Sequence, residues 1–248
     1  VGLLGNDEFG RQIINTFEKY GIDLSNLTIK EGEETYFCIS MLDNSGEKAL
    51  VIYPTSTIFP KPDDISKEMF KDARLLHTTG LYADTALRAF KFAKECNMLI
   101  SLDLEPSTLA QGCGLGVELI SQVDILFLNT HACDLLYPGG EPELAGKELI
   151  RLGPKIIVLT RGENGSIAVT ADQVVITPAF SVSVVDTTGA GDCFNAAFIY
   201  GYLKNWPLEY LLRFANAAGA ISVTGFGAQA VQPTVTQIEE FLTTSRLP

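Results

Sequence analysis

The stretch that decides the fold is Val185-Asp-Thr-Thr-Gly-Ala-Gly-Asp-Cys-Phe194, which joins a β-branched run to a mostly apolar one. Before it, Val182, Val184 and Val185 predict the buried end of a strand. After it, residues 195–203 are nearly all apolar or small, which predicts a helix. Gly189, Ala190 and Gly191 would therefore lie at the N-terminus of that helix.

A helix N-terminus preceded by glycines is suited to binding an anion. Gly189 and Gly191 allow close approach of a ligand, and the unpaired N–H groups and the positive end of the helix dipole attract phosphate. Asp192 would repel that phosphate unless it takes part in the chemistry, for example by taking a proton from an alcohol that attacks phosphorus. The alternative is that Asp192 only caps the helix and the glycines only turn the chain.

From Pro62 onward, predicted helices alternate with short apolar strands. This order predicts an α/β fold, a doubly wound and mainly parallel sheet with helices on both faces. Ligands bind such sheets at the carboxyl ends of the strands, where Asp103, Asn129 and Thr160 fall. The predicted helices are 63–73, 85–97, 117–123, 143–152, 208–223 and 236–243, and the predicted strands are 74–79, 98–103, 124–128 and 155–160.

The N-terminal part differs from this pattern. After a strand at 1–4 and a helix that ends at Gly21, residues 35–42 and 47–53 flank a turn-forming tetrapeptide and predict a β-hairpin. We expect residues 35–53 to form a small β lid and residues 1–34 and 54–248 to form the α/β domain. The alternative is an edge hairpin of the main sheet.

The amino-acid composition indicates which kinds of molecule the protein is suited to bind. The net charge of −12 disfavours nucleic acids and anionic membranes, since both favour a basic surface. The five cysteines are widely spaced and include no Cys-x-x-Cys pair, which indicates reduced thiols in a cytoplasmic protein. No window predicts a membrane span. The sequence therefore favours small-molecule partners.

The run from Asp186 to Phe194 resembles the C-terminal signature of the ribokinase-like (PfkB) carbohydrate kinases, and the similarity in element order extends over nearly the whole chain. The resemblance implies a kinase that transfers the γ-phosphate of ATP to a hydroxyl of a sugar or similar polyol, with Mg²⁺ as cofactor. It implies that Asp192 is the general base and that Gly189, Ala190 and Gly191 form the anion hole. In the family the hairpin covers the sugar and often forms a homodimer interface.

The same resemblance assigns nucleotide and cation contacts. Thr160-x-Gly162-x-x-Gly165 resembles the nucleotide-binding loop, Asn129 matches the first residue of an Asn-x-x-Glu motif near the magnesium-bound phosphates, and Asn216 matches a nucleotide-contacting asparagine. A further group of residues matches positions that hold a monovalent cation, often K⁺, largely through backbone oxygens. These are Asp186, Thr188, Ser222, Gly225 and Gly227.

The chain departs from the family pattern at several places. Ala132 stands where Asn-x-x-Glu has its glutamate. Asp134 is a poor substitute for that glutamate because it lies about 200° around the helix. Glu105 is a candidate to replace the missing carboxylate. Val231 replaces a frequent small polar residue beside the cation positions. These departures leave open an alternative, a catalytically weak relative that binds nucleotide or sugar for regulation. A dinucleotide oxidoreductase is disfavoured because the glycine turn lies near the C-terminal end.

The residues that select the acceptor are the least defined. The family's first strand and a Gly-Gly substrate motif precede the region that begins this chain, so we expect the natural N-terminus to be longer. The lid contains Tyr36 and Cys38 but no basic cluster, which disfavours a phosphorylated sugar as acceptor because a second phosphate usually requires Arg or Lys. The sequence does not distinguish among the sugars and nucleosides that the family phosphorylates.

Overall fold

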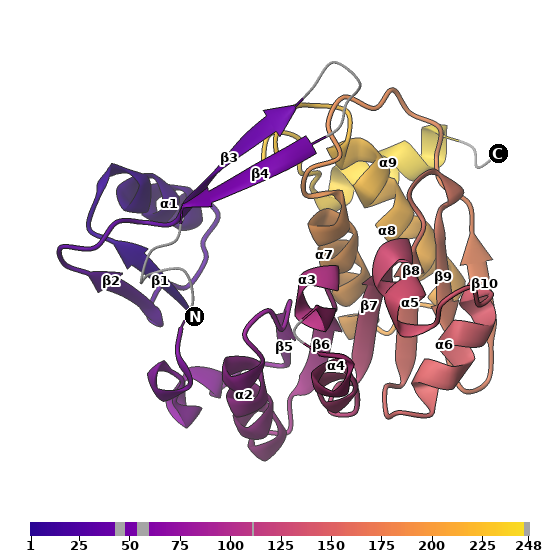
Figure 1. Cartoon of the computed structure of the whole chain (residues 1–248). Coiled ribbons are helices and arrows are strands. Elements are labelled where there is room, and N and C mark those ends of the chain that lie inside the picture. The colour runs from indigo at the N-terminus through magenta and orange to yellow at the C-terminus, as the bar shows by residue number, and fades with distance from the viewer. Residues whose placement is uncertain (43–47, 54–59, 111, 246–248) are drawn as a thin grey trace. The chain divides into compact units, whose positions relative to one another are not determined.

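A computed structural model describes residues 1–42, 48–53, 60–110 and 112–245. Its largest sheet has six strands in the order β10-β9-β8-β7-β6-β5 (Figure 1). Four adjacent strands run parallel, and the antiparallel pair β9 (Ser166–Val169) and β10 (Val174–Thr177) extends the sheet at one edge. The parallel strands are β5 (Leu75–Thr78), β6 (Leu99–Asp103), β7 (Ile125–Asn129) and β8 (Ile156–Thr160).

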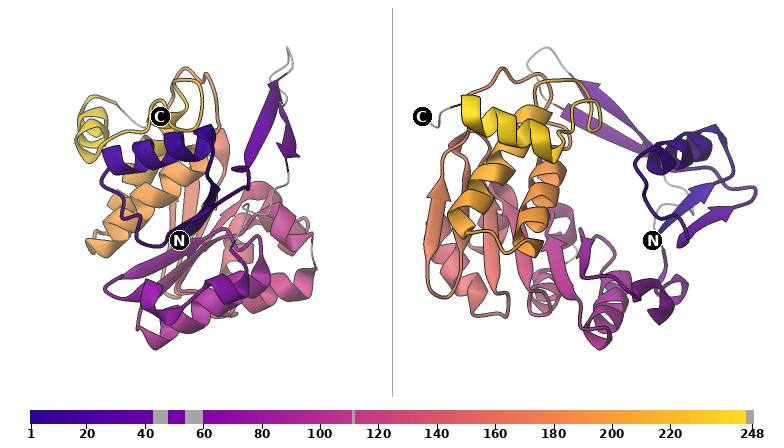
Figure 2. Two further views of the ribbon diagram at one scale, coloured as in Figure 1. Left: turned by 90° about the vertical axis from the view of Figure 1, so that its left-hand side faces the viewer. Right: turned by 180° about the vertical axis from the view of Figure 1, so that it is seen from behind.

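Helices cover both faces of this sheet. On one face, apolar side chains of β7 and β8 pack with α7 (Ala190–Leu203), α8 (Leu208–Ser222) and α9 (Val235–Thr244) in one buried core. On the other face, Gly146 of α6 (Pro142–Ile150) lies close to Val169 of β9. Figures 1 and 2 show these helix groups on opposite sides of the strands. The predicted doubly wound, mainly parallel α/β fold is confirmed.

The parallel pairing brings three polar strand ends together. Asp103 is the last residue of β6, and it pairs in register with Phe127 of the neighbouring β7. Asn129 and Thr160 end β7 and β8 and are direct partners in the register. Because the strands are parallel, all three residues reach the same edge of the sheet. The short helices after these strands are α3 (Pro106–Leu109), α4 (Cys113–Ile120) and α5 (Thr130–Leu136).

The chain divides into two compact units. The first comprises residues 1–73 and 84–96, and the second comprises residues 74–83 and 97–248. In the first unit β1 (Gly2–Gly5) pairs in parallel with β2 (Leu27–Lys30), and β3 (Phe37–Leu42) pairs antiparallel with β4 (Lys48–Tyr53). The predicted hairpin is confirmed, although its turn lies outside the described residues. The assignment of residues 35–53 to a separate lid stays a prediction. This unit also contains the α-helix α1 (Glu8–Lys19) and all but the first residue of α2 (Ala83–Glu95).

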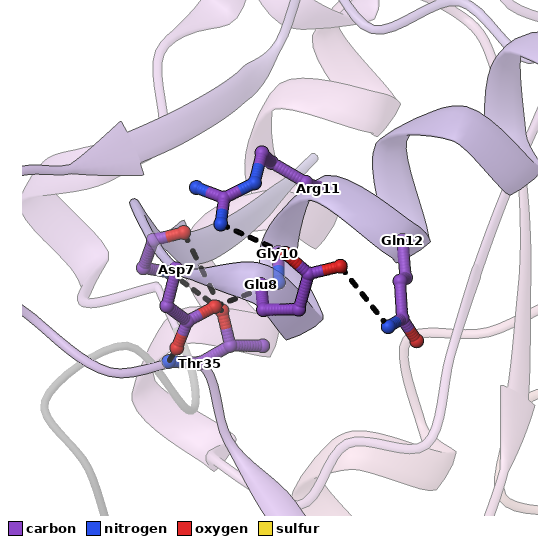
Figure 3. A network of polar contacts seen from close by, with 7 residues as sticks. Asp7, Glu8, Gly10, Arg11, Gln12 and Thr35 are labelled. Atoms are coloured by element: carbon purple, nitrogen blue, oxygen red, sulfur yellow. Dashed lines mark hydrogen bonds and ion pairs between the residues drawn. The ribbon is translucent and has the colours of Figure 1, made fainter.

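A buried threonine joins the segments at the base of the hairpin (Figure 3). The Asp7 side chain caps α1 by accepting a hydrogen bond from the Gly10 N–H at 2.7 Å. It also accepts bonds from the Thr35 backbone N–H and the Thr35 hydroxyl, both at 2.7 Å. The Gly5 N–H donates to the same hydroxyl at 3.0 Å. The end of β1, the start of α1 and the residue before the hairpin therefore form one hydrogen-bonded unit.

Two predictions about local structure were wrong. Residues 63–73 do not form one helix but two 3₁₀ turns, Pro62–Asp64 and Lys67–Phe70, because Ile65 and Ser66 between them are extended. Residues 182–185 form no strand, and the side chains of Val184 and Val185 are 62% and 41% exposed. The antiparallel strands β9 and β10 were not predicted. Among the described residues, no helix has the length and apolar character required to cross a membrane.

Candidate active site

The N-terminus of α7 is open. Its N-cap, Gly189, has a left-handed backbone with φ of 79° and provides no side-chain cap. A β-carbon at this position would lie 3.0 Å from both Cα and Cβ of Ala228, so both backbone conformation and space call for glycine. The first turn contains Gly191 and Asp192, which are both exposed. The first-turn N–H groups have no capping side chain, which leaves this helix end suited to an anion.

A pocket of about 520 Å³ lies beside this helix end. It brings together three of the residues predicted for nucleotide contact at the end of β8 and in the loop after it, one in α8, and two residues of the predicted anion hole. These six residues are Thr160, Gly162, Gly165, Asn216, Ala190 and Gly191. The structure therefore places the glycine loop and the start of α7 around one cavity.

Two of these residues shape the pocket from behind. Gly165 has φ of 79°, and a β-carbon there would lie 2.6 Å from the Pro178 carbonyl carbon and closer still to the Thr177 carbonyl oxygen. Asn216 is 8% exposed and donates from Nδ2 to the carbonyl oxygens of Thr177 and Pro178 at 3.2 and 3.1 Å. The segment after β10 is thereby held against both the glycine loop and α8.

Apolar residues form one wall of the pocket, a role that the sequence analysis did not predict for them. Phe180 is buried, and its ring meets that of Phe241 in α9 edge to face at a centroid distance of 5.1 Å. Val182 and Val184 line the same pocket, which explains why residues predicted as a buried strand end are not packed in the sheet. The signal was present in the alternation of valines, which suits a cavity wall as well as a strand. Ala179, Ala220 and Val223 also line the pocket.

Asn129 does not line this pocket. Its Oδ1 accepts a hydrogen bond from the Ala132 N–H at 2.8 Å, so the side chain caps α5. Asn129 thus has the bond of an N-cap residue, in which the side-chain oxygen accepts from the third N–H of the helix. Across the described ranges, no group of three or more His, Cys, Asp or Glu side chains has an arrangement that could hold a metal ion.

The loop before α7 and the loop after α8 are joined through one carboxylate. Asp186 Oδ1 accepts from the N–H and the hydroxyl of Thr188 at 2.9 and 2.6 Å, and Oδ2 accepts from the Gly227 N–H at 2.9 Å. The Val185 N–H donates to the Val223 carbonyl at 2.8 Å. The predicted cation residues Asp186, Thr188 and Gly227 are therefore in direct contact. Ser222 ends α8 and Gly225 lies in the second loop, where its Cα faces the Val231 side chain.

Carboxylates cluster on the other side of the α7 N-terminus. Asp103 is the acceptor of a hydrogen bond from Asn195 of α7 at 2.8 Å. Burial, followed by the negative charges of Glu105 and Asp192, raises the pKa of Asp103 to about 7, against the lowering effect of the Asn195 bond. Burial and the charge of Asp192 also raise the pKa of Glu105. The end of β6 and the first turn of α7 thus share one acidic environment.

Comparison with known proteins gives matches over nearly the whole chain. A family model described as pfkB family carbohydrate kinase matches residues 1–235. The ribokinase of Bacillus subtilis is 30% identical over 253 residues, which cover 98% of this chain and 80% of the relative. The ATP-dependent ribose-1-phosphate kinase of Halopiger xanaduensis is 29% identical over 242 residues, which cover 98% of this chain and 79% of the relative.

A solved structure agrees with these sequence matches. The structure of Arabidopsis thaliana ribokinase complexed with ribose and ATP superposes with a TM-score of 0.82 at 25% identity, covering 99% of this chain and 81% of that one. Every site residue predicted from the sequence lies within the range that the family model matches.

Proposed function

The chain belongs to the pfkB family of carbohydrate kinases and is itself a carbohydrate kinase with a ribokinase-like fold, and we propose that Asp192 and the start of α7 carry out its chemistry. Asp192 takes the proton of a sugar hydroxyl as that oxygen attacks the γ-phosphorus of ATP. The new P–O bond forms as the bond to the β-phosphate oxygen breaks, and ADP leaves with that oxygen. The N–H groups of residues 189–191 stabilise negative charge on the transferring phosphoryl group.

One geometric observation supports this most directly. The uncapped N-terminus of α7 borders the same pocket as the glycine loop after β8. A phosphate chain lying along this pocket would meet the helix dipole at one end, and its base would lie against the apolar wall. We propose that Thr160, Gly162, Gly165 and Asn216 contact the nucleotide. Asn129, which ends β7 beside its register partner Thr160, is proposed to contact the nucleotide as well.

Mg²⁺ is proposed to enter with the nucleotide. The carboxylate of Asn-x-x-Glu is replaced by Ala132, and Asn129 caps α5. Within the described ranges the side chains therefore offer no protein cage for the ion. Mg²⁺ suits this arrangement because it retains several waters and binds phosphate oxygens.

A monovalent cation such as K⁺ fits the two joined loops. The donor set of Asp186, Thr188, Ser222, Gly225 and Gly227 would provide carboxylate, hydroxyl and backbone carbonyl oxygens, all of them hard ligands for such an ion. Asp186 already links the loop before α7 to Gly227. A cation bound there would stabilise the turn at Gly189, where Ala228 leaves no room for a β-carbon.

An ADP-release assay tests the proposal. The protein with ATP, Mg²⁺ and K⁺ is offered pentoses, hexoses, keto-deoxy acids and nucleosides. Asp192→Asn should retain ATP binding but lose ~10²–10⁴-fold or more in kcat, the usual contribution of a general base. Glu209→Gln, which also removes an exposed carboxylate from the first turn of a helix, should keep the wild-type rate. Full activity of Asp192→Asn would exclude Asp192 as the base.

The second candidate function is regulatory binding without efficient turnover. The observation that favours it is Ala132 in place of a carboxylate beside the strand end at Asn129. It predicts that ATP raises the melting temperature while no acceptor in the panel is phosphorylated. Restoration of activity by Ala132→Glu would then identify the missing carboxylate as the cause.

We also propose a lid and a dimer interface on the hairpin. Ile39 and Val51 are register partners that are 54% and 49% exposed, and Met41 and Tyr53 extend the same apolar face. Such a face is covered in solution more often than left open to water. A second copy of this chain is the proposed occupant. Light scattering should give a dimer for the wild-type protein and a monomer for Ile39→Lys; a monomeric wild type would contradict the proposal.

A cytoplasmic location of the protein stays a prediction.

A further inference from the structure

The first turn of α7 has no side-chain cap to hold it in place. A helix whose N-cap is a glycine lacks the side-chain bond that usually fixes the first turn. Gly191 and Asp192 in that turn are exposed, so packing does not immobilise them. If the N–H groups are reserved for a ligand, another contact must hold the turn in place.

Asn195 makes a contact suited to that task. It follows Asp192 by three residues, so the two side chains project from neighbouring positions along one side of the helix. Asn195 is 2% exposed in a helix that is otherwise mostly apolar. A buried amide is costly unless it is hydrogen-bonded, so its presence there calls for a specific partner.

The partner is Asp103, 92 residues earlier in the chain. Asn195 Nδ2 donates to Asp103 Oδ2 at 2.8 Å. The acceptor stands on a rigid element, because Asp103 pairs with Phe127 across the parallel sheet and the Leu104 N–H donates to the Phe127 carbonyl at 3.0 Å. The bond therefore ties the second turn of α7 to a fixed point at the carboxyl end of β6.

We propose that Asn195 is a positioning residue which, through its bond to Asp103, holds the first turn of α7 and hence Asp192 and the proposed anion hole in the reactive geometry. The inference rests on the proposed function of Asp192, and it adds a residue that does not touch the reacting atoms. An error of about 1 Å in the position of such groups can cost ~10²-fold in rate.

A residue swap separates positioning from other roles. In Asn195→Asp two carboxylates face each other, and at an assay pH well above 7, where both are ionised, neither can donate and the bond is lost. The double variant Asp103→Asn with Asn195→Asp restores it with donor and acceptor exchanged, and Asp103→Asn alone keeps a carbonyl acceptor for Asn195. Ala196→Asp is the matched control, because it adds the same charge at the adjacent, exposed position of α7.

Two measurements are made on the four variants. Hydrogen exchange of the amides of residues 190–193 reports the order of the first turn without requiring turnover. Steady-state kinetics report kcat separately from the ATP dissociation constant. We expect Asn195→Asp to exchange at least ~10-fold faster in this turn and to lose ~10²-fold in kcat with ATP affinity little changed. The swap variant should recover both properties, and Ala196→Asp should alter neither.

Two results would overturn the inference. Exchange in this turn that is unchanged in Asn195→Asp would show that the bond does not order the helix end. A swap variant with wild-type exchange but the kcat of Asn195→Asp would show that Asp103 acts chemically and not through Asn195. If Asn195→Asp does not fold, the double variant tests the bond by itself: a double variant that is folded and active supports the pairing of residues 103 and 195. Failure of the proposed function would give a different result. The wild type would then phosphorylate no acceptor, while hydrogen exchange of residues 190–193 would still be faster in the variant that lacks the bond.

Discussion

Asp103 should make the stability of this protein depend on pH in an unusual direction. Most carboxylates in folded proteins have a lowered pKa and stabilise the fold as pH rises. Burial and two neighbouring carboxylates raise the pKa of Asp103 to about 7, from an ordinary value of 3.8. Its stabilising contribution is therefore complete below about pH 4 and is lost as the pH rises through 7. Above pH 7 the folded protein carries a charge that the unfolded chain accommodates more easily.

The magnitude follows from the two pKa values. At 1.36 kcal/mol for each pH unit between them, ionised Asp103 costs the folded state about 4 kcal/mol at pH 8. At pH 5 the carboxyl is mostly protonated in the folded state, and the cost falls below about 2 kcal/mol. Asp103→Asn removes the charge and keeps an oxygen that can accept from Asn195. The variant should therefore be more stable than wild type by about 2–4 kcal/mol at pH 8 and by clearly less at pH 5.

Urea unfolding of both proteins at pH 5 and pH 8 measures this difference. Asp172→Asn is the matched control, since Asp172 lies exposed in the turn between β9 and β10. The control should change the free energy of unfolding by less than about 0.5 kcal/mol at either pH. A stability difference between wild type and Asp103→Asn that is equal at the two pH values, or larger at pH 5, would refute the assignment of a raised pKa to this carboxyl.

Three further perturbations have definite expected results. Gly189→Ala should lower the melting temperature by several degrees in thermal melts, because a β-carbon would meet Ala228 and the left-handed backbone disfavours alanine. Gly191→Ala is the control: a β-carbon there has open space, so the melting temperature should not fall. Asp7→Ala should clearly lower the urea midpoint, because it removes the cap of α1 and both bonds from Thr35, while Glu8→Ala, which loses only exposed contacts with Arg11 and Gln12, should leave the midpoint nearly unchanged. Phe241→Leu should weaken ATP binding several-fold by calorimetry, since its ring supports Phe180 in the pocket wall; unchanged affinity would exclude that support.

Local patterns predicted those parts of the fold that depend on neighbouring residues. Parallel strands separated by helices bring their carboxyl ends to one edge, so the meeting of Asn129 and Thr160 followed from element order alone. Helix α7 was also predictable, because a small-residue turn preceded a long apolar run. In these cases each local preference agrees with the tertiary structure.

Other features depend on contacts that a linear pattern does not contain. The predicted helix at 63–73 is interrupted at Ile65 and Ser66, whose backbones are extended, and Asp72 near its end has φ of 61°. Strands β9 and β10 have four residues each, too few for periodicity to separate them from a loop. The bond from Asn195 to Asp103 spans 92 residues, and no local signal indicates it.

The departures from local rules gather in one region of the second unit, and this distribution itself argues for function. Helix α7 begins without a side-chain cap, and Val184 is exposed where an apolar residue would ordinarily be buried. Burial and the neighbouring carboxylates make the ionised forms of Asp103 and Glu105 costly. Each feature lowers stability, and a chain selected for stability alone would cap the helix and remove the charges. Asp192→Asn should therefore stabilise the fold above pH 7, because it removes one of the charges that face Asp103, while it impairs phosphoryl transfer. This is the pattern expected where stability has been exchanged for catalysis.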